Sequence, residues 1–93
     1  MLNTMTIINV YTKGQMTTKS FTKKGEALTY ALDMRAMGYK VVNLTAYIRE
    51  HKQILSDLGV WDKVPANERA MFKASTTDIQ VDRYMTQFRH KYM

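Results

Sequence analysis

The segment from Met5 to Thr12 constrains the fold more than any other part of the sequence. It is rich in β-branched residues and has no helix-capping pattern, so it predicts a strand. Lys13-Gly14 follows, and a two-residue loop that contains Gly is typical of a β-hairpin. Residues 15–22 carry several hydroxyl side chains and few apolar ones, so we expect them to return as an edge strand.

A helix and a third strand are predicted to follow the hairpin. The helix is expected to begin near Lys23, with Thr22 as its cap, and to end before Gly38. The face expected to pack on the sheet contains Leu28, Ala31, Leu32 and Arg35, and a second set of residues lies beside it: Ala27, Tyr30, Met34 and Met37. Residues 39–45 then predict the third strand, with Asn43 and Thr45 as alternative caps for the next helix, although the pattern also allows this strand to continue through Ile48.

The C-terminal half predicts two or three helices. They are expected over residues 46–58, 66–74 and 78–91, and Thr77 is expected to cap the last one. An apolar stripe runs along this last helix: Val81, Tyr84, Met85, Phe88 and Tyr92. The sequence therefore predicts an α+β fold in a single domain over residues 1–93. In this fold a three-stranded antiparallel sheet with one helix is followed by the C-terminal helices.

The charges are distributed unevenly along the chain. The net charge is +6, and residues 1–25 contain four lysines and no acidic residue. Residues 83–93 contain three bases and no acidic residue, while the segment between the two ends carries seven bases and eight acids. Two basic ends around a nearly neutral middle favour a surface that attracts a polyanion.

The candidate nucleic-acid-binding residues come from these two basic ends. Tyr11 and Phe21 lie on the predicted hairpin, where aromatic rings can stack on bases. The bases expected to contact phosphates are Lys13, Lys19, Lys23, Lys24, Arg83, Arg89 and Lys91.

Composition and spacing argue against several other classes of protein. The chain has no cysteine, which excludes disulfides, thiolate zinc sites and thiol nucleophiles, and which favours the cytoplasm. Neither His51 nor His90 has a ligand partner at helical spacing, and the carboxylates are dispersed, so we expect no metal site, no catalytic residue and no cofactor. No apolar run exceeds three residues, so no membrane partner is expected either.

The sequence therefore favours a small, basic, non-catalytic protein that binds nucleic acid, with RNA ahead of DNA. Such a protein suits the regulation or inhibition of an RNA-processing or nuclease complex. An alternative is a protein-interaction module or inhibitor that binds an acidic surface of a partner protein. A third hypothesis is a metal-independent RNase that uses Lys, Arg, His and Tyr side chains. The oligomeric state stays open, with a homodimer among the alternatives.

Overall fold

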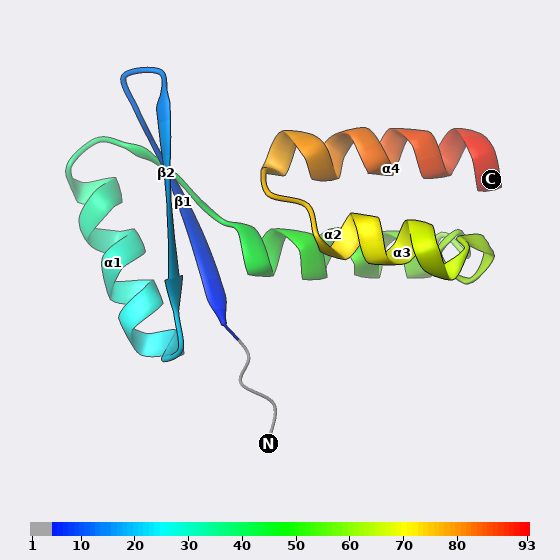
Figure 1. Ribbon diagram of the computed structural model, residues 1–93, viewed down its shortest axis with the longest axis horizontal. Helices are drawn as coiled ribbons and strands as arrows, with labels where there is room; N and C mark the ends of the chain where they lie inside the picture. The colour runs from blue at the N-terminus through cyan, green and yellow to red at the C-terminus, as the bar shows by residue number, and fades with distance from the viewer. Residues whose placement is uncertain (1–4) are drawn as a thin grey trace. The chain divides into compact units, whose positions relative to one another are not determined.

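The computed structural model describes residues 5–93 and confirms the predicted α+β fold (Figure 1). Three strands form one antiparallel sheet in the order β2-β1-β3. The elements in chain order are β1 (Thr6–Thr12), β2 (Gln15–Phe21), α1 (Lys24–Ala36), β3 (Lys40–Asn43), α2 (Leu44–Asp57), the 3₁₀ helix η1 (Trp61–Lys63), α3 (Ala66–Lys73) and α4 (Asp78–Tyr92). None of the helices within residues 5–93 is both long enough and apolar enough to cross a membrane.

The chain divides into two compact units. Unit 1 ends at Ala46 and contains the sheet and α1, whereas unit 2 runs from Tyr47 to Met93 and contains most of α2 together with η1, α3 and α4. Each unit is described by itself below. The single domain over residues 1–93 stays a prediction.

The hairpin of unit 1 closes through the predicted two-residue loop. Thr12 pairs with Gln15, so only Lys13 and Gly14 lie between the strands. Both loop residues have positive φ, 44° for Lys13 and 81° for Gly14. Two positive φ values are typical of a type I′ turn, whose twist matches that of the flanking strands. The side chain of Lys13 is therefore held at the tip of the hairpin.

The face of α1 that packs on the sheet differs from the predicted one. Ala27 and Ala31 are buried against the sheet, and they form one core with Ile8 and Val10 of β1. Tyr30 and Met34 of α1 pack against the same core. The predicted face was correct for Ala31 but wrong for the two leucines: Leu28 is 45% exposed and Leu32 is 63% exposed.

The reason for this difference is the size of the side chains on α1. Apolar residues surround this helix, so their spacing alone does not select one face. The selected face carries alanine at two positions one turn apart, Ala27 and Ala31, which lets the helix backbone lie close to β1. Larger side chains at these two positions would hold the helix away from the sheet.

The two ends of α1 are formed differently. Lys23 is the N-cap and makes no side-chain capping hydrogen bond, so the predicted cap at Thr22 was wrong. At the other end, the N–H of Gly38 donates to the carbonyl of Arg35, and the N–H of Tyr39 donates to the carbonyl of Met34. This is the Schellman pattern, which requires a left-handed residue, and Gly38 supplies it with a φ of 89°.

The third strand ends two residues before Thr45, at one of the two residues that the sequence offered as a cap for the next helix. β3 stops at Asn43, whose Oδ1 accepts a hydrogen bond from the N–H of Ala46 at 3.0 Å and so caps α2. Thr45 is already helical, and its hydroxyl oxygen accepts a hydrogen bond from the N–H of Ile7 at 2.9 Å. A side chain therefore supplies the acceptor that a longer β3 would have supplied from its backbone.

Unit 2 is built around aromatic side chains. Phe72 of α3 is fully buried, and its ring centroid lies 5.5 Å from that of Trp61 and 6.0 Å from that of Phe88. The predicted stripe of α4 is confirmed, because Val81, Met85 and Phe88 are buried. The predicted cap of α4 is also confirmed: the hydroxyl oxygen of Thr77 accepts a hydrogen bond from the N–H of Gln80 at 3.0 Å.

Candidate nucleic-acid interface

The two aromatic residues predicted to stack on bases lie on opposite faces of the sheet. Phe21 pairs with Thr6 and packs against the core under α1, where its ring centroid lies 5.3 Å from that of Tyr30. Tyr11 occupies the other face of β1, because side chains alternate along a strand. The Nζ atom of Lys40 lies 5.0 Å from the centroid of the Tyr11 ring. The sheet therefore does not bring Tyr11 and Phe21 together as one stacking platform.

The face of the sheet opposite α1 is mixed in character. By the strand register it carries Ile7, Asn9 and Tyr11 of β1, Lys40 and Val42 of β3, and Met16, Thr18 and Ser20 of β2. The residues of β2 on this face are exposed, and the hydroxyl of Thr18 donates to Oδ1 of the buried Asn9 at 2.8 Å. The exposed part of this face, on β2, offers hydroxyl groups to a ligand.

Four of the predicted lysines follow the outer edge of the hairpin, and we call them the basic edge: Lys13, Lys19, Lys23 and Lys24. Lys13 lies at the turn, Lys23 caps α1 and Lys24 begins it, so they mark the two ends of β2. Seven strand residues span about 23 Å at about 3.3 Å each. All four lysines are exposed, and none has a carboxylate within ion-pair distance among residues 5–93.

Lys19 differs from the other three lysines in its direction. It pairs with Ile8, so its side chain leaves the sheet on the same face as α1. Its Nζ atom lies 4.9 Å from the centroid of the Tyr30 ring. A cation above an aromatic face gains a modest electrostatic stabilisation when it is exposed. Lys19 therefore combines an exposed charge with a packing role over α1.

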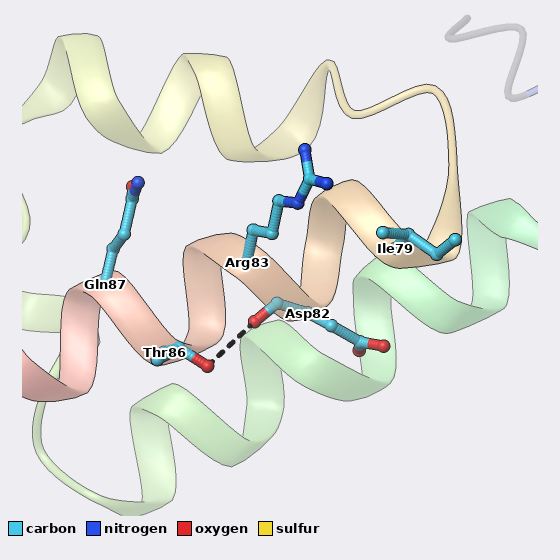
Figure 2. A pocket seen from close by; sticks show the side chains of 5 residues that line it. All are labelled: Ile79, Asp82, Arg83, Thr86 and Gln87. Carbon is cyan, nitrogen blue, oxygen red and sulfur yellow. Dashed lines mark hydrogen bonds between the residues drawn. The ribbon is translucent and has the colours of Figure 1, made fainter.

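The C-terminal bases occupy several positions on α4. Arg83 lines an open pocket of about 420 Å³ along this helix, together with Ile79, Asp82, Thr86 and Gln87 (Figure 2). Arg89 is exposed and donates from Nε to the carbonyl of Met85 at 3.3 Å. With His90 and Met93 it borders a smaller hollow of about 270 Å³.

The acid-free C-terminal sequence suggested that Lys91 is an unpaired base, but the structure pairs it with a carboxylate. Its Nζ atom lies 3.0 Å from Oε1 of Glu68 on α3, and the hydroxyl of Tyr92 donates to Oε2 of the same carboxylate. The hydrogen bond from Tyr92, followed by that from Lys91, lowers the pKa of Glu68. The hydrogen bond to Glu68 raises the pKa of Lys91. Glu68 thus neutralises the charge of Lys91, one of the three C-terminal bases predicted to contact phosphates.

A second group of cations was not predicted from the sequence, and we call it the indole cluster: Lys52, Arg69 and Lys73 around Trp61. The distances to the indole centroid are 5.5 Å for Lys52 Nζ, 5.3 Å for Arg69 Cζ and 5.9 Å for Lys73 Nζ. These residues lie in the segment whose bases and acids nearly cancel, so its net charge gave no sign of them. The four-residue spacing of Arg69 and Lys73 on one helix was the available signal.

Tyr47 and Asp82 form a further contact that the sequence did not reveal. The hydroxyl of Tyr47 donates to Oδ1 of Asp82 at 2.6 Å, and the Tyr47 ring stacks on His51 with the centroids 4.0 Å apart. This hydrogen bond, assisted by partial burial, favours the protonated phenol and raises the pKa of Tyr47 from 10.0 to about 12. The resulting stability is complete below pH 10 and is lost as the pH rises toward 12.

We therefore expect Tyr47→Phe to flatten the loss of stability at alkaline pH. Between pH 10 and 12 the wild-type protein should lose about 1 kcal/mol more of its free energy of unfolding than the variant, because the contact is largely exposed. Urea denaturation across this pH range measures the difference. Tyr39→Phe is the control, since the Tyr39 hydroxyl has no hydrogen-bond partner among residues 5–93. Equal pH profiles for the wild type and Tyr47→Phe would contradict the assignment.

Within residues 5–93, no group of three or more histidines and carboxylates is arranged to hold a metal ion. Comparison of the chain with protein-family models, with curated proteins and with solved structures found no match.

Proposed function

We propose that the protein binds nucleic acid through the basic edge of unit 1, with single-stranded RNA ahead of DNA. The observation that carries this proposal is the concentration of four exposed lysines on and at both ends of the edge strand β2, with no acidic residue in the hairpin. Cations spread over such a segment can contact a sugar-phosphate backbone without reading its sequence. The exposed hydroxyl groups of Thr17 and Ser20 on β2 support the preference for RNA, because hydroxyl groups can hydrogen-bond to the 2′-hydroxyls that DNA lacks.

A binding mode of this kind suits a regulator or inhibitor of an RNA-processing or nuclease complex. Occupying the backbone of a strand denies it to an enzyme without any chemistry by the protein itself. The absence of cysteine from the chain supports a reducing compartment, and we propose the cytoplasm.

The proposal is tested with a triple variant, Lys13→Gln, Lys23→Gln and Lys24→Gln. Its binding to single-stranded RNA, duplex RNA and duplex DNA of equal length is followed by fluorescence anisotropy over a series of salt concentrations. Each phosphate contact on a single strand contributes about 0.7 to the slope of log K against log salt. We therefore expect the triple variant to lower this slope by about two units. Lys19 is left intact because it also packs over Tyr30.

The control is a second triple variant of the same net charge: Arg35→Gln, Arg49→Gln and Lys63→Gln. These three side chains are exposed and lie outside the basic edge. A general effect of net charge would lower the slope equally in both triple variants. Equal slopes in the two variants, or no binding by the wild type, would refute the proposal.

A second candidate function is binding to an acidic segment of a partner protein. β2 is an edge strand, and its residues from Gln15 to Ser20 are exposed, so an extended peptide can pair with its free side. In this case an acidic peptide should bind more tightly than RNA of equal charge, and main-chain pairing should persist at high salt. The RNase hypothesis is examined on the same RNA samples by following the length of the RNA during incubation.

A further inference from the structure

The indole cluster of unit 2 gathers three positive charges around one aromatic ring. Lys52 comes from α2, Trp61 from η1, and Arg69 and Lys73 from α3. Each charge lies within 6 Å of the same centroid, so no two of them can be separated by more than twice that distance. Like charges at such a separation repel one another in the absence of an anion.

No acidic side chain relieves this repulsion. In the part of the chain that the structure describes, no carboxylate lies within ion-pair distance of Lys52, Arg69 or Lys73. The cluster therefore differs from Lys91, whose charge is paired with Glu68. Three cations held within 6 Å of one ring centroid, none paired with a carboxylate among the described residues, raise the local positive potential and favour an anion with several oxygens.

Arg69 is the member of the cluster whose charged group is held in place by hydrogen bonds. Its Nε atom donates to the carbonyl of Val64 at 2.9 Å, and its Nη2 atom donates to the carbonyl of Trp61 at 2.9 Å. These two bonds hold the guanidinium in place and leave three of its five N–H groups without a partner among the described residues. A guanidinium that is positioned in advance loses less freedom when it binds an anion.

The burial of Trp61 limits the chemistry of the ligand. Only 7% of Trp61 is exposed, and Phe72 packs against its ring. The indole therefore has no open face on which a base or another aromatic ring could stack. A ligand meets the ammonium and guanidinium groups alone, so its recognised part is an anionic group rather than a ring.

We propose that Lys52, Arg69 and Lys73 form a phosphate-binding site that holds one phosphodiester of a bound nucleic-acid strand. The identity of the strand rests on the proposed function, whereas the phosphate chemistry rests on the indole cluster alone. The site would give unit 2 a sequence-independent contact of its own, separate from the basic edge of unit 1.

Trp61 is the only tryptophan of the chain, so its fluorescence reports on this site directly. The protein is titrated with two probes, a single-stranded oligouridylate and inorganic pyrophosphate. Both probes should change the Trp61 emission in a saturable way. The variant Lys52→Gln with Lys73→Gln should lose this change, and its salt slope for RNA should fall by about one and a half units. Arg69 is retained because it also bonds to the backbone.

The matched control is Arg49→Gln with Lys63→Gln, which removes the same charge from exposed positions outside the indole cluster. This control should keep the emission change. If RNA binds by anisotropy while the Trp61 emission of the wild type stays constant, the site is refuted and the proposed function survives. If RNA does not bind at all, the proposed function fails. The pyrophosphate titration then decides the site: a saturable change that is lost in the cluster variant supports it, and no change refutes it.

Discussion

Replacement of Phe72 by alanine is expected to lower the free energy of unfolding by about 3–5 kcal/mol. Phe72 is fully buried, and its ring centroid lies 5.5 Å from that of Trp61, 6.2 Å from that of Tyr84 and 6.0 Å from that of Phe88. Removal of the ring leaves a cavity between three large side chains that cannot all move to fill it. A loss of this size is comparable with the whole stability of a marginal domain. Chemical denaturation followed by circular dichroism measures it.

The preceding residue on the same helix supplies the control. Met71 is 54% exposed, so Met71→Ala causes little loss of buried surface. Met and Ala also have similar helix propensities. Its free energy of unfolding should stay within about 1 kcal/mol of the wild-type value. Similar losses for the two variants would mean that the aromatic core of unit 2 is assigned incorrectly.

In unit 1 the largest effect is expected for Ile8→Ala. Ile8 is fully buried on the central strand, where it packs with Val10, Ala27 and Ala31. Truncation of a buried isoleucine to alanine costs about 2–5 kcal/mol, because it removes apolar contacts and leaves a cavity. Urea denaturation should show a lower midpoint with an unchanged slope.

Leu32→Ala is the matched comparison for Ile8→Ala. The amphipathic pattern of the sequence placed Leu32 in the core, but its side chain is 63% exposed. We therefore expect a change of less than about 1 kcal/mol for Leu32→Ala. If Leu32→Ala were more destabilising than Ile8→Ala, the helix face that carries Leu32 would be the one packed on the sheet, as the sequence pattern indicated.

Much of the fold was predictable because its signals are local. The Lys13-Gly14 loop, the helix end at Gly38 and the cap at Thr77 each depend on a few neighbouring residues. Such turns and caps act through backbone angles and short-range hydrogen bonds, which the sequence displays directly. The α+β class and the order of the elements followed from these signals.

The packed face of α1 was predicted only in part, because it depends on a contact between distant segments. It was decided by how closely Ala27 and Ala31 let the helix approach β1. This choice is not visible in the periodicity of the helix itself, because it is made by a neighbour in space. The end of β3 has a local cause instead: Asn43, one of the two caps that the sequence offered, accepts a hydrogen bond from the N–H of Ala46 three residues later.

The candidate site divides in the same way. The exposure of the basic edge followed from the polar character of residues 13–24. The pairing of Lys91 with Glu68 joins residues 23 positions apart, and the indole cluster joins α2, η1 and α3, so no count of charges along the chain could reveal either one. The pattern of charges along the chain located the cations of the basic edge. It did not reveal that Lys91 is neutralised by Glu68, nor that three other cations gather in the indole cluster.

The turn of the hairpin carries a cost that the rest of the hairpin has to offset. A lysine at a φ of 44° adopts a left-handed backbone that costs a non-glycine residue about 1 kcal/mol, whereas Asn or Gly enters it readily. Lys13 is therefore a poor residue for closing the turn and a good one for placing an ammonium group at the furthest point of the hairpin. At this one position the chain gives up folding stability in exchange for a charge held clear of the body of unit 1.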